Sequence, residues 1–253
     1  MHRSGTSVLT RILNVLGVHL GPAEQLLGPS DSNPKGHWEH EEFIKINDEI
    51  LSRFGGAWNR VPEFSEGWES ARELDDLVQL ARKTLLEDFS GVDLWGWKDP
   101  RTCLTLPFWQ RLIGPMKYVL SFRNPTDVAS SLHRRDGSSI EQGVSLWLAH
   151  CQRILAQTQN ESRLLVFYED LLDDWQHEIE RISAFIGKPE LAASAEIHKT
   201  VEEAIHKDLR HHHTLIDCDR IALNSPDSTD NNERAQWIYA QLKCGHLGNQ
   251  TEA

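Results

Sequence analysis

Two short apolar runs with a long amphipathic helix between them constrain the fold of this chain most strongly. The runs 117–122 (KYVLSF) and 164–168 (LLVFY) have the length and the side chains of buried strands. Between them, apolar residues recur on one side of a helix: Val144, Trp147, Leu148, Cys151, Ile154 and Leu155. Strands that alternate with helices of this length predict a mostly parallel sheet covered on both faces. We therefore expect an α/β protein with three layers, α/β/α.

Other apolar patterns predict the remaining elements. Helical spacing indicates helices over 6–16, 43–54, 69–88 and 175–186, and a weaker strand (LWGW) precedes Lys98. The segments 28–36 and 224–232 are rich in Gly, Pro, Ser and Asn, which predicts loops, and the second is expected to be mobile. We expect one α/β domain over residues 1–220. Residues 221–253 are expected to add a polar loop, a short helix and a disordered tail.

Composition excludes several classes of function. The chain has 26 basic and 38 acidic residues and a net charge of −12, which argues against a general binder of nucleic acid or anionic membranes. No stretch approaches the roughly 18 to 20 apolar residues that span a bilayer, and the start MHRSGTS does not resemble a secretory signal. The four cysteines form no CxxC pair, so we expect reduced thiols in a cytoplasmic protein.

The first seven residues predict an anion-binding loop. HRSGTS runs straight into a predicted helix, where backbone N–H groups at the positive end of the helix dipole suit a phosphate. Arg3 adds a charge-assisted donor, and Thr6 and Ser7 add hydroxyls. The same residues would also make a plain helix N-cap. The loop is not a Walker A motif, which requires GxxxxGK[ST].

A loop of this kind normally follows a buried strand, and no strand precedes Met1. The expected fold is therefore similar to that of the P-loop NTPases but lacks their first strand. We expect either that Met1 is an internal methionine or that the amino terminus has been lost.

A second anion site is predicted where the run 117–122 ends. Asn124 is a good N-cap, Pro125 suits the first helical turn and Asp127 complements the helix dipole. Arg123 then lies at the carboxyl end of a strand, where open α/β sheets bind ligands, and Ser131 follows on the helix. An arginine fork with a hydroxyl suits a phosphate monoester, although Arg123 could instead cap a strand edge. Together the two sites predict a ligand with two separated anionic groups.

These motifs resemble those of sulfotransferases that use 3′-phosphoadenosine-5′-phosphosulfate (PAPS). The resemblance rests on the Arg and GTS of the first loop, RNPxDVxxS at 123–131 and YEDL at 168–171, and it covers roughly residues 1 to 190. It is closest to the bacterial and tyrosylprotein-type branches. It implies that the 5′-phosphosulfate is held by Arg3, Ser4, Gly5, Thr6 and Ser7. It further implies that Arg123 and Ser131 hold the 3′-phosphate and that Tyr168 lies near the nucleotide, where it could equally be a core aromatic.

The resemblance also suggests which residues act in sulfuryl transfer. Arg3 would stabilise charge on the leaving phosphate. Lys98, in a KDP element like that of the tyrosylprotein-type branch, would approach the transferring group, or it could be a solvated lysine in a turn. Glu39 in GHWE matches a bacterial G-aromatic-aromatic-E pattern, and desolvation beside Trp38 would favour it as general base. It could instead merely charge a first helical turn. The other possible bases are His37, His40 and Asp99.

The resulting hypothesis is an enzyme that transfers a sulfuryl group from PAPS to a hydroxyl acceptor on a small molecule or glycan. The product of the donor would be 3′,5′-adenosine bisphosphate, and no metal is required. His211–His213 with Arg210 could clamp the 3′-phosphate, since the RKGxxG motif of the cytosolic branch is absent. The alternatives are a P-loop-type nucleotide kinase and a degenerate nucleotide-binding module without catalytic activity.

Overall fold

The computed structural model describes residues 1–30, 36–205, 228–245 and 247. The chain forms two compact units, which we describe separately. Unit 1 contains Met1–Leu16 and Lys117–Ala253, and unit 2 contains Gly17–Met116. The expected domain boundary at residue 220, residues 224–227 of the expected loop and the 210–213 segment lie outside the described residues. The predicted loop end at residue 232 is wrong, because a helix begins at Asn231.

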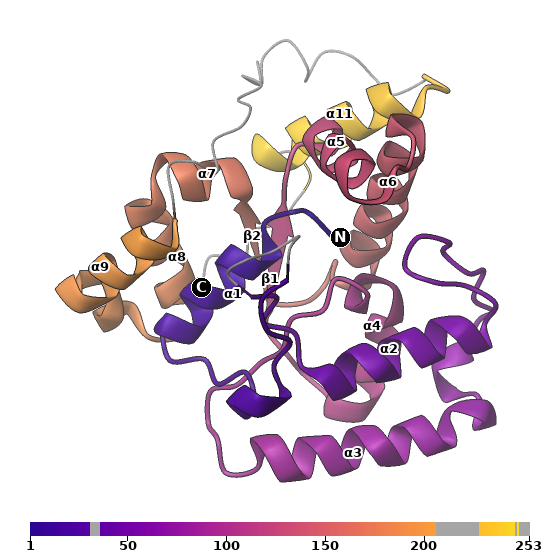
Figure 1. The fold of residues 1–253 in the computed structure, drawn as a ribbon, viewed down its shortest axis with the longest axis horizontal. Coiled ribbons are helices and arrows are strands. Elements are labelled where there is room, and N and C mark those ends of the chain that lie inside the picture. The colour runs from indigo at the N-terminus through magenta and orange to yellow at the C-terminus, as the bar shows by residue number, and fades with distance from the viewer. Residues whose placement is uncertain (31–35, 206–227, 246, 248–253) are drawn as a thin grey trace. The chain divides into compact units, whose positions relative to one another are not determined.

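Unit 1 is built on a parallel pair of strands, β1 (Tyr118–Phe122) and β2 (Arg163–Phe167). The register places Tyr118 opposite Arg163 and Phe122 opposite Phe167. The connection between the strands contains α5 (Pro125–Asp136) and α6 (Ile140–Gln157), as Figure 1 shows. The predicted α/β fold with a parallel sheet is therefore confirmed.

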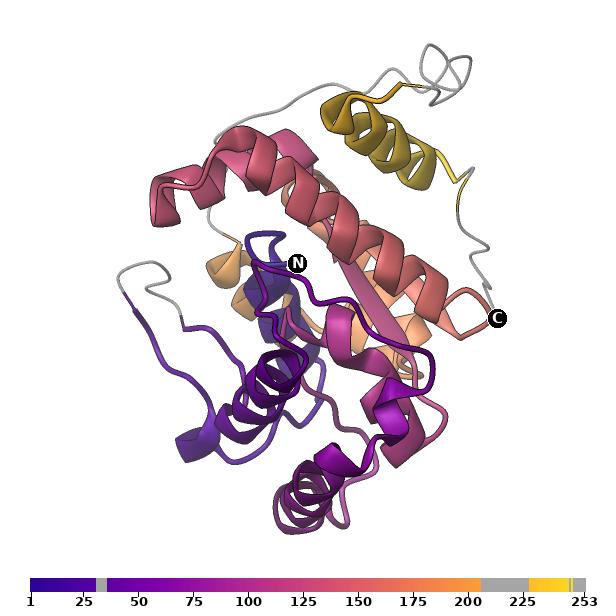
Figure 2. The ribbon, with the colours of Figure 1, turned by 90° about the vertical axis from the view of Figure 1, so that its right-hand side faces the viewer.

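Helices cover both faces of this sheet. On one face, Leu164 and Val166 pack in a core with residues of α1 (Thr6–Val15), α8 (Trp175–Phe185) and α9 (Ala195–Ala204). On the other face, the ring of Phe167 lies 5.7 Å from that of Tyr239 in α11 (Asn231–Lys243). Successive strand residues point to opposite faces, so the alternation from Val166 to Phe167 produces the two cores. Figure 2 shows the same arrangement from the side.

Local sequence signals explain where the site-bearing helices begin. Asn124 Oδ1 accepts the N–H of Thr126 at 3.0 Å and Pro125 opens α5, as predicted. In α6, Ser139 and Gln142 form a capping box. Strand β2 ends at Phe167, so Tyr168 begins α7 (Tyr168–Asp173) rather than ending the strand.

Unit 2 is helical in its regular elements. Its helices are α2 (Glu41–Arg53), α3 (Asp75–Phe89) and α4 (Thr102–Ile113), with the short 3-10 helix η1 (Ala23–Gln25) near its start. The helix expected over 69–88 begins instead with the 3-10 turns η2 (Trp68–Ser70) and η3 (Arg72–Leu74). Aromatic rings fill the core. The centre of the Phe43 ring lies 4.9 Å from that of Trp109, 5.3 Å from that of Trp97 and 5.6 Å from that of Phe89.

The prediction of a strand before Lys98 is wrong. Only a single parallel bridge forms there, between His19 and Trp95. Gly96 weakens strand pairing because it has no side chain to pack, and Trp97 places its ring among the core aromatics.

The thiols differ in part from the expectation. Cys103 and Cys151 are free, as predicted, but Cys244 is disulfide-bonded. The prediction that all four cysteines are reduced is therefore wrong. Within the described segments, no helix has the length and apolar character to cross a bilayer.

Candidate functional site

The amino-terminal loop turns sharply into α1. Arg3 and Gly5 both adopt left-handed backbone conformations, with φ of 66° and 79°. Gly5 occupies the N-cap position and has no side chain with which to cap the helix. The first N–H groups of an α-helix have no acceptor within the helix, so the loop has the geometry of an anion-binding helix terminus.

Tyr168 lies directly against this loop. A β-carbon on Gly5 would lie 2.2 Å from Cδ2 of the Tyr168 ring, closer than any side chain tolerates. The positive φ therefore favours glycine here, and contact with the ring excludes any side chain. Burial raises the pKa of the Tyr168 hydroxyl, because it disfavours the charged phenolate.

The two predicted anion elements meet in unit 1. Arg3 Nε donates to Oγ of Ser131 at 2.8 Å, although the two residues are far apart in the chain. Ser121 Oγ donates to the carbonyl of Ser4 at 2.6 Å, and this bond fastens the loop to β1. Arg123 Nη1 reaches the carbonyl of Arg3 at 3.4 Å. The predicted loop thus lies beside the predicted 3′-phosphate residues.

Arg123 is held by stacking and leaves a donor unused. Its Cζ lies 4.6 Å from the centre of the Tyr168 ring, a cation–π contact. Its Nε is buried and has no hydrogen-bond partner among the described residues. Buried donors in native proteins are nearly always paired, so this orphaned N–H fits a site for an anionic ligand.

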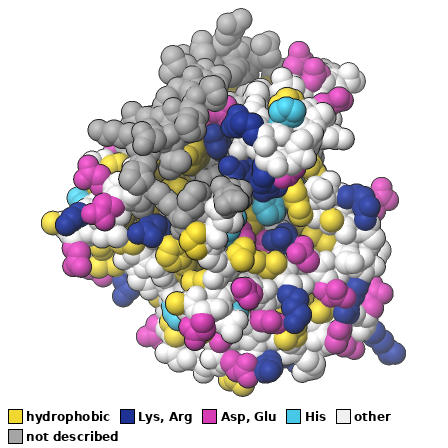
Figure 3. Space-filling view, viewed as in Figure 1, with side chains coloured by type: hydrophobic (Ala, Val, Ile, Leu, Met, Phe, Trp, Pro, Cys, Tyr) yellow, Lys and Arg dark blue, Asp and Glu magenta, His cyan; other side chains and the backbone are white. Residues whose placement is uncertain are grey.

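Two further arginines, Arg134 and Arg135, belong to the same electrostatic environment and were not predicted. Burial lowers the pKa of Arg3, and the positive charges of Arg135, Arg123 and Arg134 lower it further. Figure 3 shows basic side chains gathered over α5 and the amino terminus. Arg135 is partly neutralised by Asp136 at 2.5 Å. A cluster of mutually repelling guanidinium groups in a chain of net charge −12 favours a polyanionic ligand.

In unit 2, the two other predicted catalytic residues form an ion pair. Lys98 Nζ lies 2.7 Å from Oε1 of Glu39, and the side chains are 12% and 7% exposed. Lys98 is therefore not a solvated lysine. Burial lowers the pKa of Lys98, and the carboxylate of Glu39 opposes that shift. The sequence predicted each residue separately but not their contact.

The alternative bases have other contacts. His37 Nε2 lies 2.7 Å from Ser30 Oγ, and His40 Nε2 lies 3.1 Å from Asp88 Oδ2. Asp99 accepts from Asn47 Nδ2 at 2.8 Å and from the backbone N–H and guanidinium of Arg101. These bonds make Asp99 a fixed anchor for the turn after Lys98.

Asn47 is a polar residue whose structural role was not predicted from the sequence. Its side chain is fully buried, and besides donating to Asp99 it accepts from Thr105 at 2.6 Å and from Trp109 at 2.8 Å. A buried carboxamide with these bonds ties α2 to α4 and to the Lys98 turn. Only its place on the apolar side of α2, one residue after Ile46, could have marked it.

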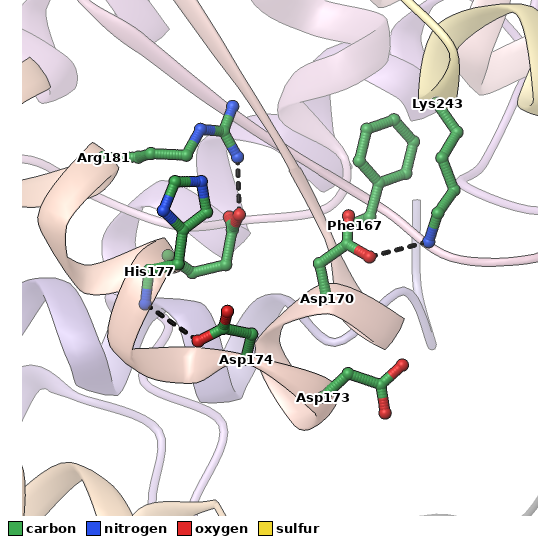
Figure 4. Close-up of a pocket in the computed structure, with 8 residues that line it drawn as sticks. Phe167, Asp170, Asp173, Asp174, His177, Arg181 and Lys243 are labelled. Atoms are coloured by element: carbon green, nitrogen blue, oxygen red, sulfur yellow. Dashed lines mark hydrogen bonds and ion pairs between the residues drawn. The ribbon is translucent and has the colours of Figure 1, made fainter.

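A pocket of about 440 Å³ in unit 1 is a poor candidate for the donor site. Its lining includes four carboxylates, those of Asp170, Asp173, Asp174 and Glu178, together with Phe167, His177, Arg181 and Lys243. Figure 4 shows ion pairs across it, one of them between Lys243 and Asp170. This acidic lining disfavours a bisphosphate. In the described part of the chain, no three metal-ligating side chains come together.

The structure defines an α/β protein in which a cluster of arginines lies beside the loop that begins α1. The chain belongs to the sulfotransferase family, whose model matches residues 1–192. That segment contains the predicted donor and catalytic residues from Arg3 to Tyr168 but not the 210–213 segment, and it ends before α9. Searches of curated proteins and of solved structures found no match.

Proposed function

We propose that this protein is a PAPS-dependent sulfotransferase that acts on a hydroxyl acceptor. The observation that carries the proposal is the convergence of Arg3, Ser131 and Arg123, with the buried Nε of Arg123 unpaired among the described residues. Membership of the sulfotransferase family supports the reaction class. The arginine cluster supports a donor with several negative charges.

The donor is assigned to two ends of the cluster. Residues 3–7 hold the 5′-phosphosulfate through backbone N–H groups and the guanidinium of Arg3. Arg123 and Ser131 hold the 3′-phosphate, and Tyr168 lies near the nucleotide. The bond between Arg3 and Ser131 supports this assignment because it couples the two ends.

The chemical step is an in-line transfer. The acceptor oxygen forms a bond to sulfur while the bond from sulfur to the bridging phosphate oxygen breaks, and Glu39 takes the proton of the hydroxyl. Arg3 and Lys98 stabilise the negative charge that develops on the leaving 3′,5′-adenosine bisphosphate. The ion pair of Glu39 and Lys98 supports giving them roles in one step, since it holds a base and a cation together. No residue of this scheme requires a metal.

Calorimetric titration with 3′,5′-adenosine bisphosphate and with ATP tests the donor. We expect tight binding of the bisphosphate without magnesium. Tighter binding of ATP with magnesium dependence would favour a nucleotide kinase. Bisphosphate binding without transfer of labelled sulfate to any hydroxyl acceptor would favour a non-catalytic module.

The variant Glu39→Gln tests the base. It should lower kcat by roughly 10²- to 10⁴-fold and leave bisphosphate affinity unchanged. Glu41→Gln, at an exposed carboxylate in the first turn of α2, is the matched control and should retain full activity. Equal rates for Glu39→Gln and wild type would remove Glu39 from the mechanism.

The cytoplasmic location remains a prediction, and fractionation of cells that express the chain tests it.

A further inference from the structure

Helix α11 lies outside the segment matched by the family and contacts the turn that carries Arg123. Gln236 Nε2 donates to Oγ1 of Thr126 at 2.7 Å and lies 3.3 Å from Oδ1 of Asn124. Asn231 Nδ2 donates to Ser145 Oγ on α6 at 3.1 Å. The amino-terminal half of α11 is therefore bonded to the start of α5.

A second route runs from Tyr239 to the same turn. The Tyr239 hydroxyl donates to Oε2 of Glu169 at 2.6 Å, and Oε1 of Glu169 accepts the N–H of Asn124 at 3.0 Å. On the other side of that peptide bond, the carbonyl of Arg123 accepts from Trp147 Nε1 at 3.1 Å. Both polar groups of the peptide bond between Arg123 and Asn124 are thus held by side chains.

Packing makes α11 a firm support. Tyr239 is 1% exposed, and its ring lies 5.7 Å from Phe167 and 6.4 Å from Trp147. Lys243 at the carboxyl end of α11 pairs with Asp170 of α7 at 2.8 Å (Figure 4). The helix is anchored at both ends, and its two routes to the Arg123 turn lie between them.

We propose that α11 positions the donor nucleotide: Gln236 and Tyr239, acting through Asn124 and Glu169, fix the backbone from which Arg123 binds the 3′-phosphate. This inference rests on the proposed function, because it assigns the 3′-phosphate to Arg123. Gln236 and Tyr239 are positioning residues and do not touch the donor. A preorganised guanidinium binds more tightly because less freedom is lost on binding.

The test compares two ligands on the full-length chain. Calorimetry gives Kd for 3′,5′-adenosine bisphosphate and for adenosine 5′-monophosphate, which lacks the 3′-phosphate. Tyr239→Phe and Gln236→Ala should each weaken the bisphosphate by roughly 5- to 30-fold, the value of one or two hydrogen bonds. The affinity for the monophosphate should change by less than about twofold, which is the size of effect expected of a substitution that touches no part of the site.

The ratio of the two affinities separates positioning from stability. Partial unfolding weakens both ligands equally and leaves the ratio unchanged, so the ratio reports only the 3′-phosphate contact. Glu233→Ala, at an exposed position in the same helix, should leave the ratio at the wild-type value. Unchanged ratios in both Tyr239→Phe and Gln236→Ala overturn the role of α11. A wild-type protein that binds the two ligands alike overturns the proposed donor itself.

Discussion

A β-carbon on Gly5 would lie 2.2 Å from Cδ2 of Tyr168, and the φ angle of Gly5 is 79°. The ring also lies 4.6 Å from Cζ of Arg123, so it contacts both the guanidinium and the residue at the N-cap of the loop. Any displacement of Tyr168 would therefore reach both ends of the proposed donor site.

Gly5→Ala should weaken the binding of 3′,5′-adenosine bisphosphate by at least about tenfold, because the loop and the Tyr168 ring cannot both keep their positions. Overpacking of this kind costs about 1–3 kcal/mol. Calorimetry and thermal unfolding measure the two effects. Gly17→Ala is the control, because Gly17 has a φ of 90° but no atom within 4 Å of an added β-carbon. It should cost about 1–2 kcal/mol of stability through backbone strain and leave bisphosphate affinity unchanged. Equal binding by the two variants would show that contact with Tyr168 is irrelevant.

Arg123→Ala should raise the Kd of the bisphosphate by roughly 30- to 150-fold, because charge-assisted hydrogen bonds contribute about 2–3 kcal/mol. Arg123→Lys keeps the charge but loses the planar fork, so an intermediate loss is expected. Titration at low and high salt completes the measurement. An unchanged affinity for Arg123→Ala would place the 3′-phosphate elsewhere.

Lys98→Met should destabilise the protein by about 3–5 kcal/mol, because it leaves the Glu39 carboxylate buried without its cation. The double variant Lys98→Met with Glu39→Gln should recover most of that loss, since no charge is then stranded. Urea unfolding of the wild type, both single variants and the double variant gives the coupling energy. Additive losses would mean that the ion pair contributes nothing to stability.

The stability of the protein should fall below pH 6.5 through His40. Burial lowers the pKa of His40 from its usual value of 6.5, although Asp88 opposes the shift. The unfolded chain therefore takes up the proton first as the pH falls, and the free energy of unfolding decreases until the lower pKa of the folded state is reached. His40→Gln should flatten this dependence in urea unfolding between pH 7 and pH 5. His177→Gln, at a side chain that is 63% exposed, should keep the wild-type profile.

The sequence predicted those parts of the fold whose signals are local. The start of α5 was predicted correctly because Asn124 and Pro125 adjoin the helix that they begin. The pairing of β1 with β2 followed from two apolar runs and the helix between them. The candidate donor residues also come from short motifs and stay a prediction, and the bond between Arg3 and Ser131 brings two of those motifs together.

Features that depend on contacts across the chain were missed or wrong. The strand before Lys98 required a neighbouring strand, and only His19 pairs there. Asn47 reads as one polar residue in a helix, because its bonds to Asp99 and Trp109 join distant segments. Tyr239 and Glu169 carry no motif that links them, since hydroxyl and carboxylate meet only after α11 has packed.

The order of the chain in unit 1 has a consequence for folding during synthesis. Leu9 and Ile12 of α1 share one core with Leu164 and Val166 of β2, and all of unit 2 lies between α1 and β2 in the sequence. At about 5–20 residues per second, on the order of 8 to 30 s separate the synthesis of α1 from that of β2. During this time the apolar face of α1 lacks its native cover, so it is the segment of the nascent chain on which a chaperone would have the longest opportunity to act.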